Sequence, residues 1–179
     1  METSRLQLRR FTLSDAADVY QYAKDPDVGP NAGWKPHPSE AHSKTIIQEH
    51  FLKQPHGFAL VDKATNKVIG SIGLTKQPFR KTYELGYSLS KDYWGQGMMS
   101  EAAALILEYG FTTLHATRIV AKTHKGNQRS ERVLEKRGLT KSKFKPRGFR
   151  RYDGVVLDVT YWSITTSQWR NHAKTQRNR

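Results

Sequence analysis

The chain has 179 residues and no cysteine, so its length fits one globular domain, and disulfides, thiolate nucleophiles and cysteine metal sites are excluded. Thirty Lys and Arg against 16 Asp and Glu give a formal charge of +14, which attracts polyanions and anionic cofactors. The longest apolar run, Ala102 to Leu107, is far shorter than the ~20 residues of a bilayer span. Residues 1–10 lack the apolar centre of a secretory signal, so we expect a cytoplasmic protein.

The first quarter of the chain predicts a strand, a helix, a loop and a second helix. Residues 6–9 alternate apolar and polar side chains, and residues 15–24 predict a helix. The Pro- and Gly-rich stretch 25–38 predicts a loop, after which Ser39 caps a helix with His50 near its buried side. The apolar residues of that helix are Ile46, Ile47 and Phe51.

Three strands follow, and their short connections predict antiparallel neighbours. Residues 58–62 and 68–74 are joined by a turn at residues 64–66, and residues 84–90 alternate strictly. An amphipathic helix is expected from Met99 to Phe111.

The last third begins with a strand over residues 118–123. Asn127 then caps a helix that ends at Gly138. Two further strands are expected around residues 140–145 and 152–164, the second rich in Val, Thr, Tyr and Trp. We expect one domain over residues 1–169 and a basic, flexible tail over residues 170–179.

Basic residues are concentrated in the segment Lys141–Arg151, which contains six of them and no acid. Phe144, Phe149 and Tyr152 interleave with these charges, a pattern typical of single-stranded nucleic-acid contact. The same composition also suits a charged edge strand that resists aggregation. Both interpretations stay open.

The junction between the strand at 84–90 and the following helix contains Gly95 and Gly97. Glycines let backbone N–H groups turn inward, and a helix N-terminus adds unpaired donors and partial positive charge, so this junction suits a pyrophosphate. The third glycine of a dinucleotide fingerprint and the Gly-Lys-Ser/Thr of a P-loop are absent. A plain strand-to-helix turn is the alternative interpretation.

Two segments together resemble the GNAT acetyltransferases, in particular the group similar to the RimJ/RimL ribosomal-protein N-terminal acetyltransferases. They are Glu84–Ala102, which includes Tyr-Trp-Gly-Gln-Gly-Met-Met-Ser-Glu-Ala, and Asn127–Leu139. The resemblance covers nearly the whole chain. It implies an α/β (α+β) fold with a mixed, mostly antiparallel sheet flanked by helices, and acetyl-CoA in a cleft between splayed strands.

The family pattern Gln/Arg-x-x-Gly-x-Gly/Ala is only partly kept, because Trp94 and Met99 stand at its flanking positions. Backbone N–H groups hold the pyrophosphate, so this departure weakens a side-chain contact and leaves the cradle intact. The residues expected to bind acetyl-CoA are Leu89, Trp94, Gly95, Gln96, Gly97, Met98, Met99, Ser100, Asn127 and Ser130.

Strand alternation puts Glu84 on one face with Gly86, which permits close approach of a substrate, so Glu84 is the candidate base that takes the amine proton. A surface carboxylate or an ion-pair partner is the alternative. The resemblance implies that Ser130 acts near the cofactor sulfur as proton donor or orienting group. It also implies a tyrosine acid seven residues after Asn127 in many members, but Leu134 stands there.

The acceptor is expected to be a primary amine, most simply the N-terminal α-amine of a protein such as a ribosomal protein. Trp34 and Glu84 are the candidate acceptor-binding residues. The alternatives are a polyamine or aminoglycoside acetyltransferase, or an RNA-binding module that has lost activity. The seven histidines show no metal-ligand spacing, so no metal is expected. The sequence is compatible with a monomer or a homodimer. It is also compatible with proximity to the ribosome or RNA through Lys141–Arg151.

Overall fold

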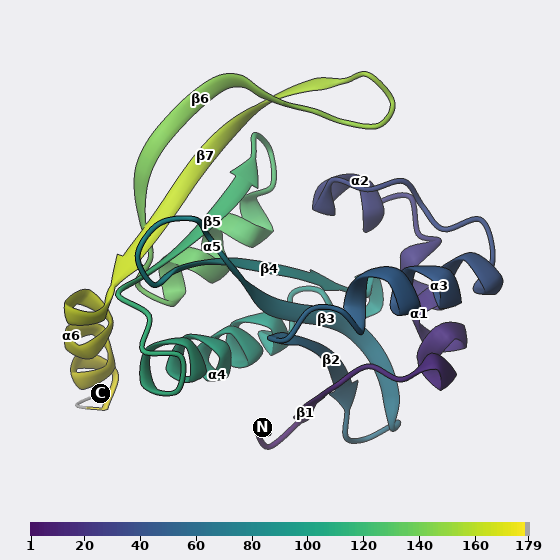
Figure 1. The fold of residues 1–179 in the computed structure, drawn as a ribbon, viewed down its shortest axis with the longest axis horizontal. Helices are drawn as coiled ribbons and strands as arrows, with labels where there is room; N and C mark the ends of the chain where they lie inside the picture. Colours follow the sequence, from purple (N-terminus) through teal and green to yellow (C-terminus); the bar gives the residue numbers. More distant parts are fainter. Residues whose placement is uncertain (178–179) are drawn as a thin grey trace.

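The structure is a computed structural model that describes residues 1–177, with the side chains of residues 1–175. Its centre is a seven-stranded sheet with the spatial order β1-β2-β3-β4-β5-β7-β6 (Figure 1). Neighbouring strands are antiparallel except β4 and β5, which are parallel, and this confirms the expected mixed sheet. The strands are β1 (Leu6–Arg9), β2 (Gly57–Asp62), β3 (Lys67–Lys76), β4 (Thr82–Leu89), β5 (Arg118–His124), β6 (Thr140–Arg150) and β7 (Val156–Thr165).

Strands β2, β3 and β4 are the three antiparallel neighbours that the sequence predicts. Their alternation separates two apolar faces: Leu60 and Ile69 join one buried cluster, and Val61 and Val68 join the other. A sheet with two apolar faces needs a cover on each.

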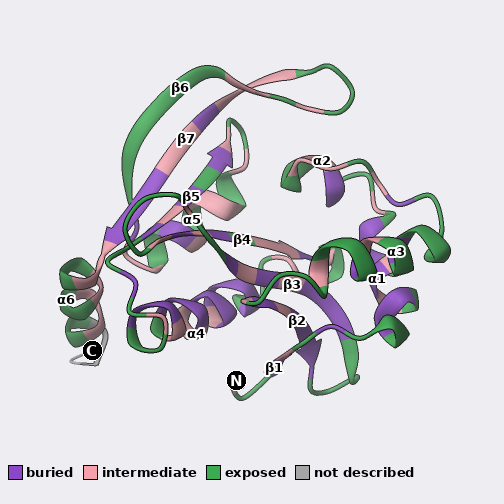
Figure 2. Ribbon diagram, in the orientation of Figure 1, coloured by how far each residue is buried: buried purple, intermediate pink, exposed green. Residues whose placement is uncertain are grey.

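Helices cover both faces of the sheet (Figure 2). Helix α4 (Met98–Thr112) buries Ile106 and Leu107 against the first cluster, and α1 (Ala16–Ala23) buries Val19 against the second. Helices α3 (Glu40–Ile46) and α5 (Gln128–Lys136) and the short α2 (Gly29–Ala32) complete the layers. Three single turns precede or continue them, η1 (Leu13–Asp15), η2 (Ile47–Phe51) and η3 (Lys91–Tyr93).

The expected burial of His50 is wrong. After α3 the chain continues as η2, a π turn, in which Ile47 is fully buried and His50 is exposed. A π turn has more residues per turn than an α-helix, so a position chosen on a 3.6-residue period leaves the buried side.

Strands β4 and β5 separate after a short common stretch. Their pairing runs from Thr82 opposite Arg118 to Glu84 opposite Val120, and it stops there although β4 continues to Leu89 and β5 to His124. Figure 1 shows β4 running across the middle of the view while β5 rises beside β7. The two strands therefore leave unpaired backbone edges facing one gap, as the predicted splayed strands require.

The hairpin of β6 and β7 is longer than predicted on its first strand and shorter on its second. Residues 152–155 form the turn instead of the start of β7, because Asp153 pairs with Arg151 at 2.6 Å and Gly154 takes a left-handed φ of +85°. The hairpin arches over β5 toward α2 (Figure 1).

The tail that the sequence predicts to be flexible starts at residue 170, inside α6 (Thr166–Arg177); its flexibility stays a prediction, and residues 178–179 lie outside the described part. Trp169 stacks on Phe111 with ring centroids 5.1 Å apart, and the His172 ring lies 3.1 Å from the Lys136 carbonyl oxygen, so α6 packs on α4 and α5. No helix in residues 1–177 has the length and apolar character to cross a membrane.

Candidate active site

A cleft of about 610 Å³ opens where β4 and β5 part. Its walls come from these two strands, from the N-terminal turn of α4 and from the length of α5. Gly33, at the end of α2, and Phe149 of β6 close it from above; a Cβ on Gly33 would lie 3.2 Å from the Phe149 ring. The cleft is therefore partly roofed by segments far apart in the sequence.

The glycine turn forms one end of this cleft. Gly95 and Gly97 have φ values of +77° and +80°, which glycine adopts without the strain other residues would meet. A Cβ on Gly95 would meet nothing within 4 Å, and one on Gly97 only the tip of Arg5 at 3.8 Å, so the space beside both is open. Gly97 caps α4, whose first N–H groups, at residues 98–100, have no partner within the helix.

Ser100 provides a further unsatisfied donor at this helix end. The residue is 6% exposed, and its hydroxyl has no hydrogen-bond partner in the described part of the chain. A buried hydroxyl at a helix N-terminus suits an anionic oxygen. The open glycine positions and this hydroxyl fit the pyrophosphate of acetyl-CoA, and the unpaired edges of β4 and β5 fit its amide-bearing arm.

Arg5 holds the glycine turn through two contacts. Its guanidinium donates to the Gln96 carbonyl oxygen at 3.1 Å and pairs with Glu101 at 2.7 Å. Gln96 is also the predicted cofactor residue that does not line the cleft, because its side-chain amide donates to the Asp92 carbonyl oxygen at 2.8 Å. The other predicted cofactor residues line the cleft.

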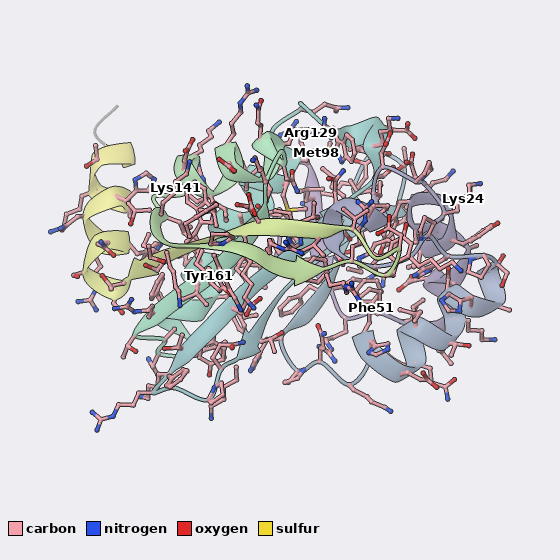
Figure 3. All side chains as sticks on the ribbon, turned by 90° about the horizontal axis from the view of Figure 1, so that it is seen from above. Lys24, Phe51, Met98, Arg129, Lys141 and Tyr161 are labelled. Atoms are coloured by element: carbon pink, nitrogen blue, oxygen red, sulfur yellow. The ribbon has the colours of Figure 1, made fainter. Side chains whose placement is uncertain are left out.

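An arginine lies beside the glycine turn although Trp94 occupies the Gln/Arg position of the expected pattern, because the Trp94 ring contacts Arg129. The Trp94 indole N–H donates to the Leu89 carbonyl oxygen at 2.9 Å, and the Arg129 guanidinium lies 3.9 Å from the centre of the Trp94 ring. Figure 3 shows Arg129 of α5 near Met98 of α4, and both residues line the cleft. The sequence analysis missed Arg129, since a cation–π pair between a loop and a distant helix has no local signal.

Ser130 meets a partner that the sequence analysis did not single out. Its Oγ lies 2.7 Å from the Tyr87 hydroxyl, inside the cleft. Burial raises the pKa of Tyr87 to about 12, although the hydrogen bond with Ser130 lowers it. Asn127 accepts from the Ser130 N–H at 3.2 Å, which is the predicted helix cap. Leu134 is fully buried in the core, so it faces the sheet and not the cleft.

Glu84 lines the cleft and pairs with Lys122 at 3.0 Å. The ion pair is the alternative that the sequence analysis left open for this carboxylate. It does not decide whether Glu84 also takes a proton, and that role stays a prediction.

Trp34 lies outside the main cleft, in a smaller cavity beside it. The sequence analysis missed His124, which lines the cleft and stacks on Phe149 with ring centroids 4.5 Å apart. Burial lowers the pKa of His124, as do the nearby charges of Arg151 and Lys122. No group of three His, Asp or Glu in the described residues is arranged to hold a metal ion.

The basic segment Lys141–Arg151 forms most of the exposed edge strand β6 and the residue that follows it. Phe144 is 58% exposed, whereas Phe149 is turned to His124 and cannot serve as an external stacking platform. Contact with RNA through this edge stays a prediction, and so does its role as a charged edge.

Several known proteins similar to this chain are acetyltransferases by name. Residues 5–140 match the family described as "Acetyltransferase (GNAT) domain". A protein of Bacillus licheniformis named "Uncharacterized N-acetyltransferase p20" is 30% identical over 93% of this chain and 96% of its own. The "[Ribosomal protein uS5]-alanine N-acetyltransferase" of Escherichia coli is 28% identical over 76% of this chain and 75% of its own. The crystal structure of a GNAT-family acetyltransferase from Bacillus anthracis superposes with a TM-score of 0.83 at 26% identity, over 93% of this chain and 98% of its own.

Proposed function

This chain belongs to the GNAT family of acetyltransferases, and we propose that it moves the acetyl group of acetyl-CoA onto the N-terminal α-amine of a protein, such as a ribosomal protein in the cytoplasm. One observation carries the proposal: the gap between β4 and β5 ends at an open glycine turn with an unpartnered buried hydroxyl on Ser100. Such a site accepts a long ligand with an anionic end.

Acetyl-CoA supplies an acetyl group activated as a thioester. In the proposed reaction the amine nitrogen bonds to the acetyl carbon, the carbon–sulfur bond breaks, the amine loses a proton and the sulfur gains one. Glu84 takes the amine proton, directly or through water. Ser130 donates a hydrogen bond or a proton to the sulfur, and Tyr87 fixes its hydroxyl from 2.7 Å away.

Proton chemistry favours an α-amine as the acceptor. At pH 7 roughly a tenth of an α-amine with pKa near 8 is neutral, against far less than a hundredth of a lysine with pKa near 10.4. A modest base therefore suffices for the α-amine. The relative that acts on ribosomal protein uS5 supports a protein acceptor.

Charge disfavours polyamines and aminoglycosides, which are polycations. Among the described residues that line the cleft, Glu84 is the only acid, and Lys122 already neutralises it. The same lining carries the basic residues Lys122, Arg129, Arg132 and Lys136. These cations attract an anionic cofactor and repel a polycationic acceptor.

The test measures CoA release from acetyl-CoA with N-terminal peptides, peptides whose only free amine is on lysine, spermidine and an aminoglycoside in parallel. We expect the N-terminal peptides to give the highest kcat/KM. A higher value for spermidine or the aminoglycoside would replace the proposed acceptor and leave the acetyltransferase assignment intact.

A further inference from the structure

A second cavity, of about 200 Å³, adjoins the main cleft on the face of the sheet that α1 and α3 cover. Its walls are largely aromatic. Phe11 and Phe51 stack with ring centroids 4.3 Å apart, and Trp34 lines the same cavity. Figure 3 places Phe51 on the α1 and α3 side of the molecule, away from Lys141. We call this cavity the aromatic pocket.

The aromatic pocket has a polar floor and no charge. Ser71 of β3 and Ser88 of β4 line it, and their hydroxyls lie 2.9 Å apart. Tyr22 lies behind them, close enough that both serines act on its pKa, and its fully enclosed hydroxyl has no hydrogen bond of normal geometry with any described residue. No described residue that lines this pocket carries a charged side chain.

Gly86 joins the aromatic pocket to the main cleft. It lines both cavities, as do Tyr87 and Ser88, and a Cβ built on it would meet nothing within 4 Å. Glu84, the proposed base, lies two residues earlier on the same strand and therefore on the same face. An amine held at this junction is close to Glu84, and the group attached to it is directed toward the pocket.

We propose that the aromatic pocket binds the side chain of the acceptor's first residue, and that it selects small uncharged side chains over charged ones. The inference rests on the proposed function, because it presumes a peptide N-terminus as acceptor. Aromatic walls bury an apolar or hydroxyl-bearing side chain, and the serine pair offers a partner to a hydroxyl. A charged side chain would lose its water and find no opposite charge there.

The experiment compares peptides that differ only in their first residue, Ala, Ser, Val, Lys or Asp, by CoA release. We expect kcat/KM at least ~100-fold higher for Ala, Ser and Val than for Lys and Asp, in line with the cost of burying an unpaired charge. Equal kcat/KM across the five peptides would overturn the inference and leave the proposed function standing. Acetylation of spermidine or lysine without any of the five peptides would overturn both.

A charge placed in the aromatic pocket gives a second test. Ser71→Asp should raise the ratio of kcat/KM for the Lys-first peptide to that for the Ala-first peptide by ~10-fold or more, since an ion-pair partner then exists. Ser167→Asp is the control: it adds the same charge on the exposed start of α6, outside both cavities, and should leave the ratio unchanged.

The milder Ser71→Ala guards against misfolding of the charged variant. It should lower kcat/KM for the Ser-first peptide relative to the Val-first peptide by several-fold, because it removes one hydroxyl of the floor. If neither variant at Ser71 changes the order of the peptides, the aromatic pocket does not contact the first residue and the inference is wrong.

Discussion

Ser130 and Tyr87 share a hydrogen bond, and in the proposed mechanism the two residues together serve the departing sulfur. Burial keeps the pKa of Tyr87 at about 12, so the phenol stays protonated throughout the pH range of an assay. It can therefore hold the Ser130 hydroxyl by a hydrogen bond at any such pH. Ser130 is then oriented toward the cleft without a tyrosine at position 134.

We expect Ser130→Ala to lower kcat by ~10²- to 10⁴-fold and to leave the Kd of acetyl-CoA nearly unchanged, because a donor to the departing sulfur acts as the transition state forms. Tyr87→Phe should lower kcat less. The double variant should cost little more than Ser130→Ala alone, since Tyr87 acts through Ser130.

Steady-state kinetics of the three variants give kcat, and titrations with acetyl-CoA give the Kd. Ser142→Ala is the control, because its hydroxyl bonds the Tyr161 carbonyl oxygen on the exposed hairpin, outside the cleft. Full activity in Ser130→Ala would show that water protonates the sulfur.

The proposed role of Glu84 is tested by how the activity lost on its substitution depends on pH. Glu84→Gln should reduce kcat/KM strongly near pH 7 and progressively less toward pH 9, because an α-amine above its pKa of about 8 no longer needs a base. Rates with an N-terminal peptide between pH 6.5 and 9.5 give the two profiles.

A matched ion pair supplies the control for Glu84. Glu131 pairs with Lys141 at 3.3 Å, its side chain is 24% exposed against 26% for Glu84, and it lies outside the cleft. Glu131→Gln should therefore leave the rate unchanged. A loss in Glu84→Gln that is the same at every pH would make the Lys122 pair a structural contact only.

At the scale of elements, the turn between β4 and α4 depends on open space beside two left-handed glycines. Gly97→Ala should weaken acetyl-CoA binding by ~10-fold or more, because its methyl group would enter the space assigned to the pyrophosphate. It should also destabilise the fold by about 1–2 kcal/mol, the usual cost of a left-handed conformation in a residue with a Cβ.

Gly154→Ala separates these two effects. Gly154 has a φ of +85° and no atom within 4 Å of a built Cβ, but it lies in the β6–β7 turn, outside the cleft. Both variants should lose similar stability in urea, and only Gly97→Ala should lose affinity for acetyl-CoA. Equal affinities in a titration would exclude the turn as the phosphate cradle.

The segment from α2 to α3 is held in place by a buried imidazole. The His37 ring lies 2.8 Å from the Ser43 hydroxyl, and its backbone N–H donates to the Ala23 carbonyl oxygen at 3.0 Å. Burial, and then the charge of nearby His42, lower the pKa of His37 to about 4. The folded protein thus keeps this ring neutral over a range in which a free histidine is protonated.

Stability should therefore fall as the pH falls from about 6.5 to about 4. In that window the unfolded chain binds a proton at position 37 that the folded chain does not, so acid favours unfolding, by up to about 3 kcal/mol. Urea unfolding at pH 7, 5.5 and 4.5 measures the slope. His37→Asn should flatten it, and His50→Asn, at an exposed histidine, should not.

The elements that the sequence predicted best are those with a clear local period. The β2–β4 strands and α4 agree with prediction because alternation and the 3.6-residue spacing record directly which side is buried. The misses have non-local or irregular causes. The π turn displaces His50, and the Asp153–Gly154 turn replaces the start of a strand.

For the molecule as a whole, the sequence predicted the residues with local signals in the candidate site better than the contacts between distant segments. The glycine turn, Asn127 and Ser130 carry local signals, and the structure brings them to one cleft. Two contacts, Tyr87 with Ser130 and Arg129 with Trp94, depend on how α5 lies across β4 and the turn. No spacing in the sequence indicates that arrangement. Gly86 as a junction between two cavities likewise depends on the whole fold.

Acetyl-CoA binding should appear as a stability gain of the whole molecule. A ligand at 100 times its Kd adds about 2.7 kcal/mol to the native state, which for a chain of this length raises Tm by roughly 5–10 °C. Because cations line the cleft, the gain should shrink between 50 mM and 0.5 M NaCl as the charges are screened. Arg129→Gln should reduce the Tm shift, and Arg170→Gln, an exposed position on α6, should not. A shift that neither salt nor Arg129→Gln changes would mean that the phosphates bind elsewhere than beside Trp94.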